Sequence, residues 1–120
     1  MNYQIDRTVY VTDSKGKITK LDLNDLFEDE HIPDTRKEYM RKILKDIFAS
    51  YCTPIQAKVA YMYYAEMKPM AEIAEIEKRN KSSICRDLAK AKRELSTKMG
   101  HYKSEFLHIA AASGELAKYY

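Results

Sequence analysis

A dense group of basic side chains between positions 78 and 98 offers the clearest chemistry in this sequence. The segment holds eight Lys or Arg residues against two acids, a net charge of +6, whereas the whole chain carries only +3. The remaining residues therefore sum to −3, so the excess positive charge is concentrated on one segment, as it is on surfaces that bind phosphate. The alternative interpretation is a solvated helix face that happens to be basic.

The same segment has the periodicity of a helix with one buried face. Ile84, Leu88, Ala91 and Leu95 recur at i, i+4, i+7 and i+11, which predicts an apolar stripe. A helix held by one face, with polar and basic side chains on the other, is suited to the major groove of DNA. The candidate DNA-binding residues are Asn80, Lys81, Ser82, Ser83, Cys85, Arg86, Lys90 and Arg93.

Two helices are expected to precede and support this segment. The run 35–38 (Thr-Arg-Lys-Glu) has the form of a capping box, and the apolar positions from Tyr39 to Tyr51 then fall on one side of a helix. The run 53–56 (Thr-Pro-Ile-Gln) repeats this signal with a proline at the first helical position and opens a helix to about Glu66. Its predicted buried face comprises Ile55, Val59, Met62 and Tyr63, and the tyrosines at 61, 63 and 64 are interpreted as core rather than as a platform for stacked bases.

Residues 70–95 are predicted to form two helices joined by a short polar turn. Pro69 can open the first helix, and Arg79-Asn80 forms the turn. Asn80 or Ser82 can cap the second helix, and Gly100 is expected to end it.

The first thirty residues are harder to interpret. Residues 3–23 contain β-branched positions in alternation around a turn at 13–16, which is compatible either with a small hairpin or with a partly ordered arm. Residues 22–30 hold five acids and no Lys or Arg. A solvated linker is favoured there over a short helix with an apolar edge.

The last twenty residues show a second amphipathic pattern, interrupted at Ser113-Gly114. The predicted C-terminal helix either packs within the monomer, which is the favoured interpretation, or forms the surface of a homodimer. Its apolar positions are Tyr102, Phe106, Ile109, Ala110 and Leu116.

Composition predicts a mainly α protein, to which the alternation in residues 3–23 adds at most a small N-terminal β-hairpin. The chain has 120 residues, 45% of them apolar, with three glycines, three prolines and no tryptophan. We divide it into an arm or hairpin with an acidic linker (1–31), a helical domain (32–100) that contains the two-helix segment (70–95), and a C-terminal helix (101–120). No run is apolar enough for a membrane span, and two sparse cysteines favour a reducing, cytoplasmic setting.

Catalytic and metal-binding residues are not grouped in any familiar spacing. The histidines at 31, 101 and 108 do not combine with Cys52 and Cys85 into a zinc pattern. The sequence has no glycine-rich phosphate loop and suggests no nucleophile–base pair. We therefore expect no enzyme activity, no metal site and no cofactor.

Residues 53 to about 97 resemble the helix-turn-helix domain of the sigma-factor region 4 family and of the regulators built on it. The matching residues are Thr53-Pro54-x-Gln56, Ile73-Ala74-Glu75 and Ser82-x-Ile84-x-Arg86-x-Leu88-x-x-Ala91-x-x-x-Leu95. The resemblance implies a recognition helix over residues 81–95. Base-reading positions would fall on Lys81, Ser82, Cys85 and Arg86, and Lys90 and Arg93 would face phosphate.

The chain departs from the family pattern at both turns of this domain. Met67 and Pro69 stand where the family has a turn glycine and a serine or threonine cap, and Lys78 and Arg79 replace the glycine and small aliphatic of the inter-helix turn. A turn without glycine must avoid positive φ or bear its strain. Cys85 also replaces a polar or basic residue, so one base contact is expected to be apolar, for example to a thymine methyl.

Together these observations favour a sequence-specific regulator of transcription that binds double-stranded DNA, of the small kind common on phages and mobile elements. Nothing in the sequence matches the promoter-melting regions of a complete sigma factor. The alternative is a protein-interaction module, in which the same fold binds RNA polymerase or a phage packaging partner without reading DNA.

Overall fold

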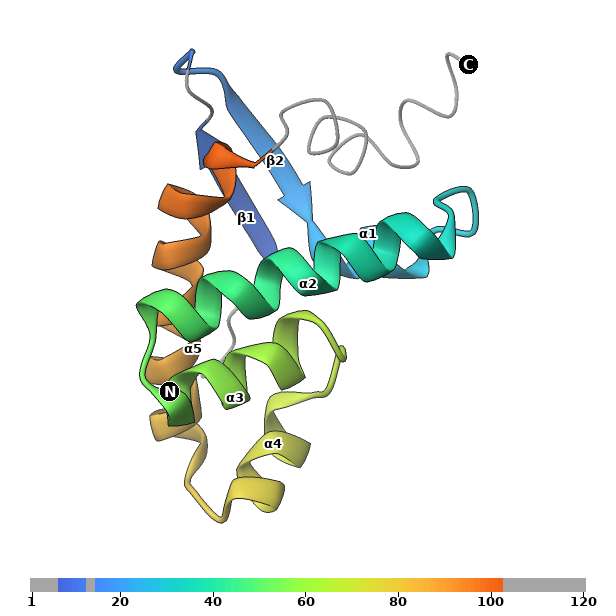
Figure 1. Ribbon diagram of the computed structural model, residues 1–120. Helices are drawn as coiled ribbons and strands as arrows, with labels where there is room; N and C mark the ends of the chain where they lie inside the picture. The colour runs from blue at the N-terminus through green and yellow to red at the C-terminus, as the bar shows by residue number, and fades with distance from the viewer. Residues whose placement is uncertain (1–6, 13–14, 103–120) are drawn as a thin grey trace.

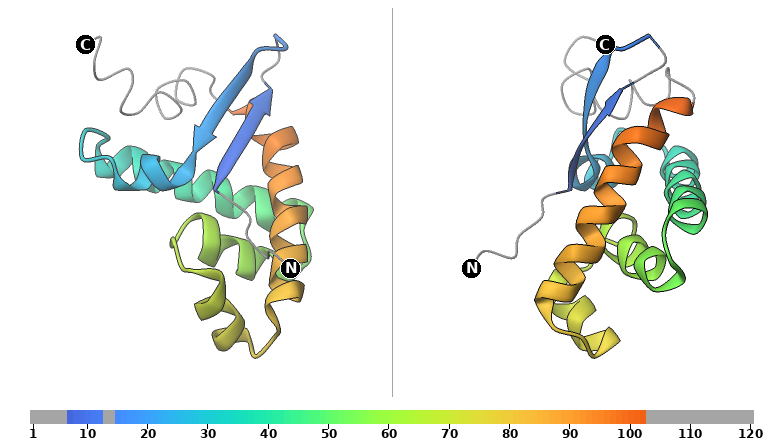
Figure 2. Two further views of the ribbon diagram at one scale, coloured as in Figure 1. Left: turned by 180° about the vertical axis from the view of Figure 1, so that it is seen from behind. Right: turned by 90° about the vertical axis from the view of Figure 1, so that its left-hand side faces the viewer.

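Helix α5, Lys81–Lys98, contacts more of the other described elements than any other helix does. The computed structural model describes residues 7–12 and 15–102. Helices α2, α3 and α4 and strand β1 all contact α5. In Figure 2, right, α5 runs between the hairpin on one side and α2 on the other.

The helices before α5 are α2 (Asp34–Tyr51), α3 (Pro54–Tyr64) and α4 (Met70–Glu77). Figure 1 shows α4 at the end of the molecule opposite the hairpin. A short 3-10 helix, Met99–His101, follows α5, so Gly100 lies just past its end as expected. The mainly helical architecture confirms the predicted fold class.

The predicted start signals of α2 and α3 had different outcomes. The capping box of α3 is confirmed, because Thr53 Oγ1 accepts from the Gln56 N–H at 3.2 Å and Gln56 Oε1 accepts from the Thr53 N–H at 3.1 Å. The capping box expected at Thr35 is wrong. Helix α2 begins at Asp34, two residues before the first helical position that a cap at Thr35 implies, and its N-cap Pro33 makes no side-chain cap hydrogen bond.

The buried faces of these helices are narrower than predicted. Tyr39 and Tyr51 on α2 are 38% and 47% exposed, and Ile55 on α3 is 59% exposed. All three lie at the margins of their helices' apolar faces or in an end turn, where no other described element covers them fully. The tyrosine interpretation is confirmed for Tyr63 and Tyr64, which are buried.

The N-terminal hairpin exists and is part of the core. Strand β1 (Thr8–Thr12) pairs antiparallel with β2 (Ile18–Asp22), with Val9 opposite Leu21 and Val11 opposite Thr19. Val9, Val11 and Leu21 are buried, whereas the other face of the hairpin exposes Tyr10 and Ile18. The interpretation of this stretch as a partly ordered arm is therefore wrong for the described residues.

Arg7 ties the start of the hairpin to the end of α3. Its guanidinium donates to the Tyr63 carbonyl and to the Lys68 carbonyl, each at 2.9 Å, and lies 4.1 Å from the Tyr63 ring centroid. A cation beside carbonyls at a helix C-terminus is favoured by charge as well as by hydrogen bonding.

The acidic run is a short helix, and the linker favoured from its charge is wrong. Helix α1, Leu23–Glu28, is capped by the Asp22 carboxylate, which accepts from the N–H groups of the second and third helical residues, Asn24 and Asp25. Leu23, Leu26 and Phe27 are buried. The guanidinium of Arg41 on α2 covers the Phe27 ring at 4.7 Å.

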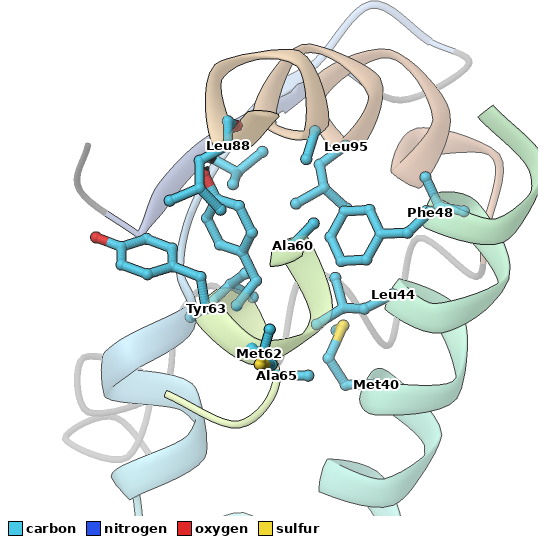
Figure 3. Packing of buried hydrophobic residues seen from close by; sticks show 14 of the residues in the cluster. Met40, Leu44, Phe48, Ala60, Met62, Tyr63, Ala65, Leu88 and Leu95 are labelled. Atoms are coloured by element: carbon cyan, nitrogen blue, oxygen red, sulfur yellow. Dashed lines mark hydrogen bonds between the residues drawn. The ribbon is translucent and has the colours of Figure 1, made fainter. Parts of the chain in front are cut away.

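Within the described residues, one cluster of buried side chains runs from the hairpin through α1 to α5 and on to Met99. Figure 3 shows its centre, where Phe48 of α2, Ala60 of α3 and Leu95 of α5 meet. The C-terminal helix expected at 101–120, and with it the homodimer surface, falls almost wholly outside the described residues. No helix in the described part of the chain has the length and apolar character needed to cross a membrane.

Candidate nucleic-acid interface

The turn between α4 and α5 has the geometry of a glycine turn without the glycine. Lys78 has φ 53° and ψ 45°, in the left-handed region. Its N–H donates to the Glu75 carbonyl at 3.3 Å, and the N–H of Arg79 donates to the Ala74 carbonyl at 3.0 Å, which is the Schellman pattern. The chain thus bears the strain of positive φ and keeps the turn.

Met67, the other position where the family has a turn glycine, also has positive φ, at 58°. The pyrrolidine of Pro69 precedes α4 rather than standing in its first turn, and offers no side-chain cap. Both departures from the family pattern therefore change side chains while leaving a glycine-type backbone at each turn.

Asn80 caps α5 and is occupied in doing so. Its Oδ1 accepts from the Ser83 N–H at 2.9 Å and from the Ser82 hydroxyl at 2.6 Å. The side chains of Asn80 and Ser82 are therefore bonded to each other at the start of the helix. Of the candidate residues, they are the least available for a direct contact with bases.

The apolar stripe of α5 is confirmed, since Ile84, Leu88, Ala91 and Leu95 are each fully buried. Tyr64 of α3 fixes this face further, because its hydroxyl donates to the Leu88 carbonyl at 3.5 Å. The predicted orientation of the helix is therefore correct.

Three basic residues lie exposed on α5: Lys81, Arg86 and Arg93. At about 100° per residue, positions 86 and 93 lie within about 20° of each other around the helix axis and about 10 Å apart along it. Both lie nearly opposite the buried stripe. Arg86 Nη2 also lies 3.4 Å from the Ser83 hydroxyl, a weak contact that orients the guanidinium along the helix.

Lys90 and Cys85 are half-buried, whereas the sequence predicted that both would lie on the open, DNA-binding face of α5. Lys90 Nζ pairs with the Glu94 carboxylate at 2.7 Å, four residues along the same helix. This pair lies toward the α2–α3 turn, where burial raises the pKa of the Cys52 thiol, the Glu94 charge raises it further and the Lys90 charge opposes the rise. Lys90 is thus placed at the flank of the helix.

Asp87 and Arg79 form a contact that the sequence reasoning missed. The Asp87 side chain on α5 is only 11% exposed, and its Oδ2 accepts from Arg79 Nη1 at 2.6 Å. The signal was present in the spacing, because position 87 is three residues from Ile84 and four from Ala91, at the edge of the stripe. An acid there requires a counter-ion, and the basic turn supplies it.

In the described ranges, no group of three or more His, Cys, Asp or Glu side chains is arranged to hold a metal ion. Comparisons of the chain with family models, with curated proteins and with solved structures give no match.

Proposed function

We propose that this protein is a sequence-specific regulator that binds double-stranded DNA, with α5 as its recognition helix in the major groove. The proposal extends the resemblance of residues 53–97 to the sigma region 4 family of helix-turn-helix domains. The bases would be read chiefly by Arg86, with Lys81 and Cys85 beside it, and Arg93 would contact the backbone.

The observation that carries the proposal is the charge left on α5 once its ion pairs are formed. Both acids of residues 78–98 are paired with a base of the same segment, Asp87 with Arg79 and Glu94 with Lys90. The exposed arginines therefore face solvent on a helix whose carboxylates are already compensated. Such a face attracts the phosphates of a nucleic acid.

A second candidate function has support from α4. Glu72 and Glu75 are exposed on this helix, and Ile76 beside them is 46% exposed. Acidic and apolar side chains suit a protein partner better than a phosphate backbone. The alternative proposal is therefore a protein-interaction module that binds a partner such as RNA polymerase through α4.

Binding to DNA of mixed sequence at several salt concentrations separates the two proposals. A DNA-binding protein should lose affinity steeply, with a log–log slope near −0.9 for each phosphate contacted. A protein-interaction module should show weak binding and almost no slope. Selection from a random duplex pool would then give the preferred site.

On that site, Arg86→Ala should cost about 1–3 kcal/mol of binding free energy and relax the preference for one base pair, because arginine contacts guanine through two hydrogen bonds. Arg36→Ala is a matched control, since Arg36 is exposed on α2, away from α5. Equal losses for Arg86→Ala on selected and random duplexes would show that Arg86 touches only phosphate.

A further inference from the structure

Arg79 is fixed at both ends of its side chain. Its backbone belongs to the Schellman turn, where its N–H donates to the Ala74 carbonyl at 3.0 Å. Its guanidinium is held by the buried Asp87 carboxylate at 2.6 Å. An arginine side chain restrained in this way loses little conformational freedom when it binds a ligand.

The guanidinium nevertheless remains in reach of solvent. The Arg79 side chain is 30% exposed, and the bond to Asp87 uses one of the five N–H donors of the fork. A guanidinium with one edge on a buried carboxylate can present another edge to a second anion.

The position of the Arg79 guanidinium relative to the exposed arginines indicates which anion it would bind. Asp87 follows Arg86 directly, so it lies about 100° around the helix axis from it. The major groove is about 12 Å wide and a helix with its side chains about 10–12 Å across. When Arg86 faces the base edges, a group at the flank of the helix therefore faces the phosphates that border the groove.

We infer that Arg79 binds a phosphate of the DNA backbone at the edge of the groove, with Asp87 as its positioning residue. This inference rests on the proposed function and adds a contact outside the predicted set. Arg79 supplies orientation on the duplex and no base preference, as phosphate contacts do.

The direction in which Asp87→Asn changes the affinity for DNA distinguishes a positioning role from a simple effect of charge. Asp87→Asn removes a negative charge from the DNA-binding side, so electrostatics alone predicts tighter binding. Loss of the positioning contact predicts instead that affinity falls, by roughly five- to tenfold near 0.1 M salt if one phosphate contact is lost. Glu77→Gln is the matched control, because it also removes a largely buried carboxylate paired with a base, but that base is Lys58 of α3, outside the candidate set. It should leave affinity unchanged or raised.

Arg79→Ala should reduce the salt slope by about 0.9 and weaken binding equally on selected and random duplexes. In the Arg79→Ala background, Asp87→Asn should no longer weaken binding. The double variant leaves no buried unpaired carboxylate, so it stays interpretable if either single variant fails to fold. Thermal melting of each variant by circular dichroism establishes which are folded at the assay temperature.

Three results are decisive for the intact chain. A steep wild-type slope that falls by about 0.9 in the double variant supports the inference. A steep slope that is unchanged in the double variant overturns it, and shows that the pair only braces the turn. A flat wild-type slope overturns the proposed function itself, and the role of Arg79 with it.

Discussion

Replacing Lys78 by glycine should make this protein more stable. Lys78 is exposed, has φ 53° and closes the turn between α4 and α5. A side chain with a Cβ is strained in that region because the Cβ approaches the following carbonyl oxygen. Glycine adopts the same backbone without this contact, and no packing of the lysine side chain is lost.

The magnitude follows from two opposing terms. A left-handed conformation costs a residue with a Cβ about 1–2 kcal/mol, which glycine recovers. Glycine also gives the unfolded chain more freedom, which costs about 0.5–1 kcal/mol relative to alanine. The net gain in the free energy of unfolding is about 0.5–1 kcal/mol. For a domain of this size that corresponds to a rise of roughly 2–5 °C in Tm.

Lys78→Ala is the control, because it removes the same charge and side chain but keeps the Cβ. Urea unfolding followed by circular dichroism should place Lys78→Gly above Lys78→Ala by about 0.5–1 kcal/mol, which is the strain term less the entropy of glycine. Both variants should bind DNA alike, since both lose one positive charge. Equal stability of the two variants would refute the left-handed turn, and with it the angle between α4 and α5.

Three further predictions concern the orientation of α5 and the burial of Cys52. Leu88→Ala should cost about 2–5 kcal/mol of unfolding free energy, because Leu88 is fully buried; an unchanged urea midpoint would mean that the helix presents another face to the core. The preferred duplex should protect Cys85 from iodoacetamide and leave Cys52 unaffected, as read by mass spectrometry of the labelled peptides. Because burial raises the pKa of Cys52, a smaller fraction of this thiol is ionised at a given pH than of an ordinary thiol. Its alkylation should therefore be slow at pH 7. The rate of alkylation should still increase with pH where the rate for an ordinary thiol has become constant. Protection of both thiols, or of neither, would contradict the proposed docking face.

The sequence predicted best where one local pattern decides the outcome. The stripe from Ile84 to Leu95 has the helical period and is fully buried, and the capping box at Thr53 depends only on residues three apart. Such signals do not depend on distant parts of the chain. They fixed the face that α5 turns to the core, and so the face on which the candidate residues lie.

The sequence predicted the structure poorly where residues distant in the chain decide how a segment folds or pairs. The acidic run was interpreted as a linker from its charge, but Leu23, Leu26 and Phe27 form a helical i, i+3, i+4 set that becomes useful only when a core is there to cover it. Arg41 on α2 completes that cover over Phe27. Charge counting also treated every base of α5 as free, whereas Lys90 is paired with Glu94.

The contact between Arg7 and the end of α3 also bears on the order in which the protein folds. Arg7 and the carbonyls that it binds are separated by 56 and 61 positions, and β1 packs on a helix that begins at Lys81. During synthesis the hairpin therefore lacks its main packing surface until most of α5 has left the ribosome. A two-stranded hairpin alone is marginal in water, and closing loops of this length is slow compared with forming local helices. The helices α2 to α5 are thus expected to assemble first, and the N-terminal strands to dock last.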